Sequence, residues 1–314
     1  MALRDSPFDA ANPESPVFGT GRFVGRVGLV RNLATRLGRR QSVLLYGGPR
    51  LGKTSLLLHL KWRLEQQRST SPHDGPSAVY VDLREDEARK RFLAGHRDQA
   101  PVLLLDNCDH LLRPTMPRVT QLLPSKGNGG PVQAVVWAGG RAWREFIRSG
   151  QSGLKLLPVP LAVLLKGEAR SLVKPDLTVD QIDSVLSDGG THPYVLKVLR
   201  ARMIADGPTA DPAQTLQAVR ARLATFFLAC LEAVREPIER TLLDHLIVQA
   251  KPMNPREAAH ALGLPTVKAA ADTLCYLGLI SRWNLTEGAM LHVSCRLFNE
   301  WYLGHVDKQR SLRG

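Results

Sequence analysis

The segment GGPRLGKT, residues 47–54, constrains the fold of this 314-residue chain more than any other stretch. A short apolar run, SVLLY, precedes it. A helical pattern, TSLLLHLKWRLEQQR, follows it, and its apolar stripe consists of Leu56, Leu57, Leu60 and Leu64. The order strand, glycine-rich loop, helix is the repeating unit of an α/β fold.

Further apolar runs have the character of strands: AVYVDL, PVLLLD and PVQAVVWAGG, separated by helical or turn-rich stretches. Strands that alternate with helices and are apolar throughout indicate a parallel sheet with helices on both faces. LKLLPVPL contains two prolines, so we expect an edge strand there. Apolar positions at helical spacing before the first strand predict a helix that ends near Gly38.

The pattern changes near residue 166, where strands give way to helices. LTVDQIDSVLSDGG, HPYVLKVLRARMI and DPAQTLQAVRARLATFFLACLEAVREP predict a small helical domain over 166–235. PIERTLLDHLIVQ, PREAAHALGL and PTVKAAADTLCYLGLI then predict helices, and SRWNLTEGAMLHVS predicts a β-hairpin that turns at Glu287 and Gly288. This order predicts a winged helix over 236–314. The α/β core then spans 18–165, and we expect the polar, proline-rich residues 1–17 to form a flexible arm.

GGPRLGKT also matches the pattern G-x-x-x-x-G-K-[ST], in the strand-loop-helix context that the pattern requires. Backbone N–H groups of such a loop surround a phosphate, and the start of the helix adds its positive dipole. Lys53 reaches the β- and γ-phosphates, and the Thr54 hydroxyl is a ligand for Mg²⁺. A chance glycine-rich turn with a surface lysine is the weaker alternative. The predicted loop residues are Gly47, Gly48, Pro49, Arg50, Leu51, Gly52, Lys53, Thr54 and Ser55.

A phosphate-binding loop needs an acid near the metal, supplied by the end of a neighbouring strand. Asp106, directly after PVLLL, is the candidate, and the alternative is that it only caps a turn. Asn107 stands where many nucleotide-hydrolysing enzymes place a glutamate, and an amide cannot accept a proton from the attacking water. Asp109 is a candidate substitute, although capping of the following helix is the favoured role. Asp82 and Glu85, at the end of AVYVDL, are weaker alternatives.

These motifs together resemble the STAND and archaeal-type branch of the AAA+ ATPases, in which a P-loop core precedes a helical lid and a winged helix. The resemblance spans nearly the whole chain. FVGR, residues 23–26, resembles the family's linker motif, which implies that Phe23, Val24 and Gly25 lie beside the adenine. LLLDNCDHL is similar to the family's apolar strand with D-E-x-D and departs from it at Asn107. Asp109 then corresponds to the motif's own second acid, which argues against its being a substitute.

Two further segments carry the resemblance. VVWAGGRAW, residues 135–143, resembles the strand that carries the sensor-1 residue, and this implies a contact of Arg141 with the γ-phosphate. An arginine in a solvated loop is the open alternative. GGTHPYVLKVL resembles the family's G-x-P element, which implies that His192 and Pro193 contact the adenine and the β-phosphate side. The alternative is that Gly190 ends one helix and Pro193 begins the next without a ligand.

The net charge of +13 is concentrated near the N-terminus, where residues 1–70 hold 12 Lys or Arg against 4 Asp or Glu. The arginines beside the first helix are either a solvated helix face, which we favour, or a patch for nucleic acid or an acidic partner. The predicted winged helix, in contrast, has 9 basic against 8 acidic residues over 236–314. Its second helix offers Lys268 and little else, so we expect it to pack within the protein rather than to read DNA.

The sequence therefore predicts an ATP- and ADP-binding, Mg²⁺-dependent molecular switch that hydrolyses ATP slowly and controls a partner protein in a signalling or defence system. Whether hydrolysis occurs at a useful rate, and whether the chain forms a homo-oligomer, stays open. The rival hypotheses are a DNA-associated initiator or transposition-type ATPase and a degenerate core that holds nucleotide as structural filler. No run approaches the roughly 20 apolar residues that span a bilayer, so we expect a cytoplasmic protein without a membrane partner.

Overall fold

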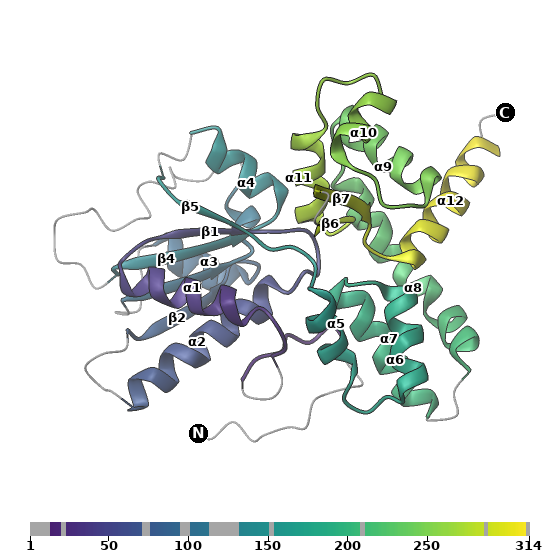
Figure 1. Cartoon of the computed structure of the whole chain (residues 1–314). Helices are drawn as coiled ribbons and strands as arrows, with labels where there is room; N and C mark the ends of the chain where they lie inside the picture. The colour runs from purple at the N-terminus through teal and green to yellow at the C-terminus, as the bar shows by residue number, and fades with distance from the viewer. Residues whose placement is uncertain are drawn as a thin grey trace. The chain divides into compact units, whose positions relative to one another are not determined.

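A computed structural model of the chain describes residues 13–19, 23–70, 76–94, 101–112, 132–150, 154–207, 211–285 and 288–311 (Figure 1). The chain forms two compact units. The core unit consists of Pro16–Gly47 and Gly52–Leu161. The C-terminal unit consists of Met1–Ser15, Gly48–Leu51 and Ala162–Gly314.

A five-stranded sheet of order β2-β3-β4-β1-β5 forms the centre of the core unit. Its strands are β1 (Val43–Tyr46), β2 (Ala78–Asp82), β3 (Val102–Asp106), β4 (Ala134–Gly139) and β5 (Leu157–Pro160). All four strand pairs are parallel, so every strand ends at the same edge of the sheet. The predicted parallel sheet is confirmed, and the proline-containing β5 lies at the edge as expected, paired to β1.

Helices cover both faces of this sheet, as predicted (Figure 1). The helices are α1 (Val27–Gly38), α2 (Lys53–Thr70), α3 (Asp86–Leu93) and α4 (Arg141–Arg148), with a short 3-10 helix, η1 (Cys108–Leu111). Alternate strand residues such as Leu103, Leu105 and Trp137 pack in one cluster with Phe92 of α3 and Trp143 of α4. The intervening strand residues are buried as well, which explains why the strands are apolar throughout.

The C-terminal unit contains the three helices predicted for residues 166–235. They are α6 (Val179–Gly189), α7 (Pro193–Asp206) and α8 (Pro212–Glu232). A fourth helix, α5 (Lys166–Val173), lies in a stretch for which the sequence predicted no helix. The end of the predicted arm contacts these helices. Glu14 accepts hydrogen bonds from Tyr194 of α7 at 2.5 Å and from Arg222 of α8 at 3.0 Å, and Lys197 donates to the Ser15 carbonyl at 2.7 Å.

The remainder of the C-terminal unit has the order of a winged helix. It contains α9 (Pro237–Gln249), α10 (Pro255–Ala261), α11 (Lys268–Leu277), the antiparallel strands β6 (Ile280–Leu285) and β7 (Gly288–Val293), and α12 (Arg296–Ser311). Met253 adds a bridge to Leu291 of β7. The hairpin predicted to turn at Glu287 and Gly288 is present; Gly288 already pairs with Leu285, and Glu287 lies outside the described residues. Within the described ranges, no helix is long and apolar enough to cross a membrane.

Candidate functional site

The glycine-rich loop connects β1 to α2, as predicted, and the helix begins at Lys53, one residue before the predicted helical stretch. Two residues of the loop adopt positive φ angles, 56° at Arg50 and 90° at Gly52, as residues of anion-binding backbone loops often do. The Lys53 ammonium donates to the Gly47 carbonyl at 2.9 Å, so its side chain folds over the loop. Gly48 has no room for a side chain, because the Leu277 carbonyl oxygen lies against the position that a Cβ atom would take.

Arg26 is a neighbour of the loop that the sequence did not single out for this site. A Cβ atom on Gly52 would lie 3.1 Å from the Arg26 Nη1 atom, so the guanidinium of Arg26 lies directly against the loop. Arg26 itself occupies the left-handed region with φ 55°, where it caps the start of α1. FVGR therefore brings a cation to the phosphate-binding loop in addition to its apolar residues.

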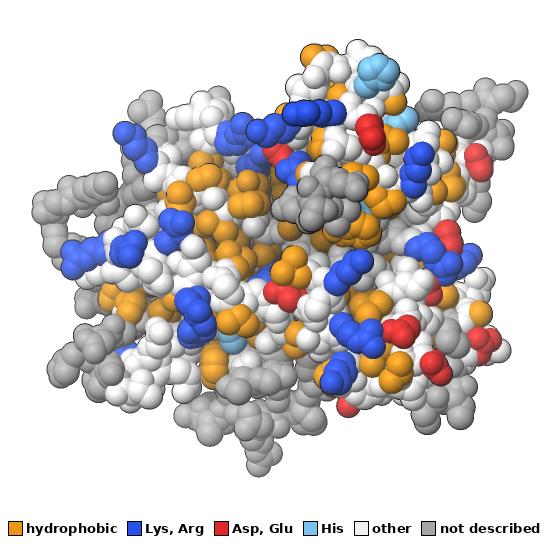
Figure 2. Space-filling view, in the orientation of Figure 1, with side chains coloured by type: hydrophobic (Ala, Val, Ile, Leu, Met, Phe, Trp, Pro, Cys, Tyr) orange, Lys and Arg blue, Asp and Glu red, His pale blue; other side chains and the backbone are white. Residues whose placement is uncertain are grey.

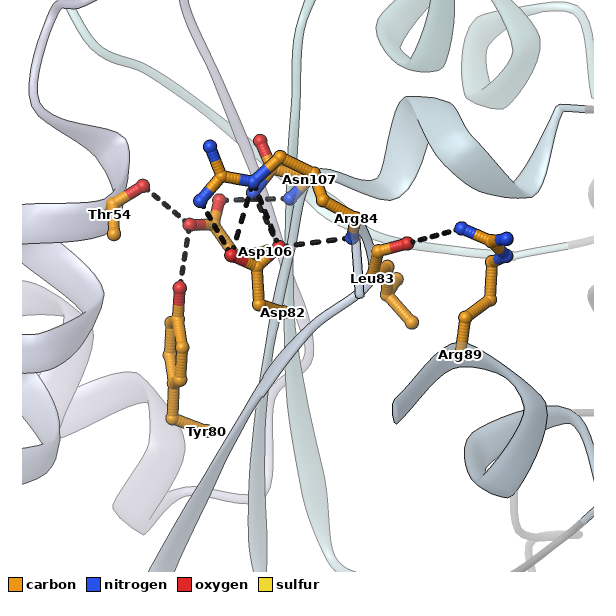
Figure 3. A network of polar contacts seen from close by, with 8 residues as sticks. All are labelled: Thr54, Tyr80, Asp82, Leu83, Arg84, Arg89, Asp106 and Asn107. Carbon is orange, nitrogen blue, oxygen red and sulfur yellow. Dashed lines mark hydrogen bonds and ion pairs between the residues drawn. The ribbon is translucent and has the colours of Figure 1, made fainter. Parts of the chain in front are cut away.

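Asp106 lies fully buried at the end of β3 and receives three hydrogen bonds (Figure 3). The Thr54 hydroxyl donates to its Oδ2 atom at 2.5 Å, and the Tyr80 hydroxyl donates to the same oxygen at 3.0 Å. The Asn107 N–H donates to Oδ1 at 2.9 Å. The structure therefore brings together Thr54 and Asp106, the two predicted metal ligands. Thr54 follows β1 and Asp106 ends β3, and β4 lies between these two strands in the sheet.

A second acid, Asp82, lies beside Asp106 because the two end neighbouring strands in register. Its Oδ1 atom accepts from the Asn107 side-chain amide at 2.9 Å, and both carboxylate oxygens accept from the Arg84 guanidinium, the shortest contact being 2.6 Å (Figure 3). The Asn107 backbone is left-handed, with φ 57°, a conformation that asparagine tolerates better than most residues. The amide that replaces the usual glutamate is thus engaged with a carboxylate.

The pKa values of Asp82 and Tyr80 at this edge are shifted. Burial alone would raise the pKa of Asp82, but hydrogen bonds from Arg84 and Asn107 outweigh it and hold that pKa below its usual value. Burial, with the negative charges of Asp106 and Asp82, raises the pKa of Tyr80 well above its usual range. At neutral pH Tyr80 is therefore a hydrogen-bond donor and Asp82 is a carboxylate of low basicity.

Asp109 and Arg141 lie near this network but have other partners. The Asp109 carboxylate accepts from the N–H groups of Gly140 at 2.6 Å and Trp143 at 3.0 Å, which is the geometry of a cap on the start of α4. Arg141, the first residue of α4, is buried and donates to Glu145 at 2.5 Å. Contacts of Asp109 or Arg141 with a nucleotide stay a prediction.

The predicted base-pocket residues Phe23, Val24 and Gly25 precede α1, and each is half-buried. Phe23 stacks on His59 of α2, with ring centroids 4.2 Å apart and an interplanar angle of 7°. Ser55, the residue after Thr54, accepts a hydrogen bond from the Val17 N–H at 3.0 Å. The N-terminal segment thus lies along the first turns of α2, which start at the phosphate-binding loop.

His192 and Pro193 belong to the C-terminal unit. His192 is buried and precedes α7, Pro193 is the first residue of that helix, and the His192 ring lies 5.0 Å from the ring of Phe226. This arrangement is the helix start that the sequence offered as an alternative. The loop residues Gly48–Leu51 belong to the C-terminal unit. Among them Leu51 is fully buried, and Arg50 forms an ion pair of 2.5 Å with Glu14.

Tyr80 and Arg84 are the parts of the network that the sequence analysis did not identify. Tyr80 lies two residues before Asp82, so in a strand both side chains point to the same face. That spacing was a usable signal, but it needed the pairing of β2 with β3 to place Tyr80 beside Asp106. Arg84 follows the strand end by two residues, where a side chain has no fixed direction.

Oxygen atoms from a hydroxyl and a buried carboxylate are the donor set that Mg²⁺ takes when a phosphate supplies further ligands. The Thr54 and Asp106 pair fits this requirement, because its two oxygens already lie within one hydrogen bond of each other. The loop has the positive φ angles, at Arg50 and Gly52, that are common in anion-binding loops, while the N–H of its Gly48 donates to the Tyr276 carbonyl at 2.6 Å. Lys53, Arg26 and Arg84 supply positive charge around it.

Comparison with solved structures gives the same fold. A Walker-type ATPase of Pyrococcus abyssi superposes with a TM-score of 0.55 at 12% identity, covering 92% of this chain and 98% of that one. The ORC2 protein of Aeropyrum pernix, solved as ADPNP and ADP complexes, superposes with a TM-score of 0.53 at 13% identity, covering 97% of this chain and 98% of that one. No protein-family profile and no curated protein matches the sequence. The chain has the fold of the AAA+ P-loop ATPases.

Proposed function

We propose that the chain is a Mg²⁺-dependent ATP- and ADP-binding switch of the AAA+ type that hydrolyses ATP slowly. The single observation that supports this most is the hydroxyl of Thr54 at 2.5 Å from the buried Asp106 carboxylate, beside the glycine-rich loop. A buried carboxylate is costly unless it is paired or binds a metal. Here it receives three neutral hydrogen bonds, so a divalent cation would supply the positive charge that this set of partners lacks.

Slow hydrolysis follows from the groups available as a general base. Asn107 holds the position next to Asp106, and its amide cannot take a proton from water. Asp82 is a carboxylate that could act as the base instead, but it is bound by Arg84 and Asn107, and its lowered pKa makes it a poor proton acceptor at neutral pH. Asp109 is engaged in capping α4. We therefore expect the site to hold nucleotide far longer than it takes an ordinary ATPase to turn it over.

The switching step requires that ATP and ADP make different contacts. Arg84 is suited to detect the difference, because 58% of its side chain is exposed while its guanidinium lies against Asp82. A γ-phosphate at the same edge would offer this guanidinium a second anion and so compete with Asp82. Asp82 and Asn107, no longer held by Arg84, would then change position with the nucleotide state. A partner protein would bind the surface that this change creates. This last step, including a signalling or defence role, rests on the resemblance to STAND proteins.

The test combines binding and turnover in the full chain. We expect calorimetry to show Mg-ATP and Mg-ADP binding by the wild type, strong loss of binding in Lys53→Ala, and no change in Lys61→Ala. Lys61 is the matched control, since it lies on the same helix and, among the described residues, forms only an exposed ion pair with Glu65. Rapid steady-state hydrolysis that depends on Lys53 would contradict the slow switch while leaving nucleotide binding intact.

A DNA-associated ATPase is the second candidate, and a specific observation favours it. Figure 2 shows Lys and Arg side chains, with few Asp or Glu among them, on the face of the core unit that carries α1. Arg31, Arg39 and Arg40 are exposed there, whereas Arg22 lies outside the described residues. Against it, the winged helix presents only the exposed Lys268 as a basic residue on α11. Fluorescence anisotropy with duplex DNA at low salt separates the candidates, since phosphate contacts would make binding salt-dependent and sensitive to Arg39→Glu.

A further inference from the structure

The C-terminal unit contains a cavity of about 630 Å³ that includes none of the residues of the candidate nucleotide site. Its wall is built from the starts of α5 and α12, the ends of α6 and α9, the loop between α6 and α7, and strands β6 and β7. A volume of this size suits a small organic molecule. Polar residues in this lining include Lys166, Thr191, Lys251, His292 and Asn299.

The charge of this lining is of one sign. It includes four basic side chains and no Asp or Glu. Arg170 and Arg296 are engaged, the first with Asp183 at 2.9 Å and the second with the buried Asp188. The ammonium of Lys166 lies over the Trp283 ring at 4.5 Å, and Lys251 is exposed; neither has an acidic partner among the described residues. These two ammonium groups attract an anion.

Three residues of the same wall each carry a buried polar atom without a hydrogen-bond partner among the described residues: Thr191 Oγ1, His292 Nε2 and Asn299 Oδ1. Buried polar atoms are almost always satisfied, so such a group of three indicates a missing partner. His292 Nδ1 lies 2.8 Å from the Val293 carbonyl, which requires the proton on Nδ1 and leaves Nε2 as an acceptor. The cavity therefore combines cations with acceptors that need O–H or N–H donors.

We propose that this cavity binds a phosphate ester of a hydroxyl-bearing sugar. Lys166 and Lys251 hold the phosphate, and the sugar hydroxyls donate to His292 Nε2 and Asn299 Oδ1. The N-terminal ends of α5 and α12 in the wall add to the attraction for the anion. Nucleoside monophosphates and simple sugar phosphates share this chemistry, and the proposal holds whether or not the glycine-rich loop binds nucleotide.

The experiment titrates the full chain calorimetrically with AMP, ribose 5-phosphate and inorganic phosphate. We expect at least one of the two esters to bind, and inorganic phosphate to bind about tenfold more weakly or not at all, since it lacks the sugar donors. Tighter binding of AMP assigns the site to nucleotides, and equal binding of both esters assigns it to sugar phosphates. Equal binding of inorganic phosphate and the esters would overturn the proposal, as would the absence of binding at millimolar concentration.

Variants locate the binding. Lys251→Glu reverses an exposed charge without disturbing the core of the unit and should weaken the ester about tenfold or more, and Asn299→Ala should weaken it several-fold. Lys268→Glu, an equally exposed lysine outside the lining, and Lys53→Ala in the glycine-rich loop should leave the affinity within about twofold. An affinity that is unchanged in Lys251→Glu, or lost in Lys53→Ala, places the ligand elsewhere and refutes the site.

Discussion

The contact between Asn107 and Asp82 makes a quantitative prediction about replacing Asn107 with the glutamate that nucleotide-hydrolysing enzymes usually carry. Asn107→Glu removes a hydrogen bond to a charged group, which costs about 1.5–3 kcal/mol. It also places a residue with little preference for the left-handed region at φ 57°, for roughly 1 kcal/mol. Like-charge repulsion with Asp82 adds about 1 kcal/mol after solvent screening. Since such terms overlap, the core unit should lose about 3–4 kcal/mol.

Hydrogen exchange measures this loss where it arises. Amides of the β2 and β3 ladder should exchange roughly 200- to 900-fold faster in Asn107→Glu than in the wild type, while peptides of α9 in the C-terminal unit keep their rates and serve as an internal control. Asn107→Ala, which lacks the added charge, should be destabilised by about 1 kcal/mol less than Asn107→Glu.

The double variant Asp82→Asn, Asn107→Glu decides whether the contact itself is responsible. It exchanges the amide and the carboxylate between the two positions, so the hydrogen bond returns and the repulsion disappears. We expect the double variant to be at least about 2 kcal/mol more stable than additive single effects imply. Additive effects, or unchanged exchange in Asn107→Glu, would show that the contact between Asn107 and Asp82 does not stabilise the core unit.

Four further predictions concern other contacts. Tyr80→Phe removes one hydrogen bond to the buried Asp106 carboxylate and should lower the free energy of unfolding by about 1–2 kcal/mol in denaturant titration. Asp109→Ala should destabilise α4 by about 1–2 kcal/mol, as a lost helix cap does, while leaving nucleotide affinity unchanged in calorimetry. Arg84→Ala should reduce the ratio of ATP to ADP affinities; an unchanged ratio removes Arg84 from the switch. Burial lowers the pKa of Lys197 from 10.5 to about 8 in the folded chain. Between these two pH values the unfolded chain binds more protons than the folded chain, so the free energy of unfolding of the wild type increases as the pH rises. Lys197→Met should lack this gain, as pH-dependent denaturation would show.

Much of the fold was predictable because its determinants are local. The glycine-rich loop needed only its spacing and its flanking apolar runs, and Asp106 needed only its position after a uniformly apolar strand. The edge position of β5 followed from its prolines. Helix α4 was missed although Ala142, Trp143, Phe146 and Ile147 lie at helical spacing, because RAWREFIR directly follows two glycines and spans only 8 residues.

The details of the site were less predictable because they depend on strand order. Tyr80 becomes a partner of Asp106 only once β2 pairs with β3 in the register that aligns Asp82 with Asp106. The direction of the Asp109 carboxylate is set by the start of α4, which comes from a segment about thirty residues later in the chain. Arg26 lies against the loop because its backbone is left-handed, and a left-handed arginine cannot be predicted from a residue pattern.

We propose that the glycine-rich loop, Thr54 and Asp106 together hold a magnesium-bound nucleotide. The affinity for ATP, measured with Mg²⁺ and with EDTA, tests this in the wild type and in Thr54→Val, which keeps the shape of the side chain and removes its hydroxyl. We expect Mg²⁺ to strengthen binding in the wild type and most of this gain to be lost in Thr54→Val. Wild-type affinity that is the same with Mg²⁺ and with EDTA, or no binding of ATP at all, would contradict it.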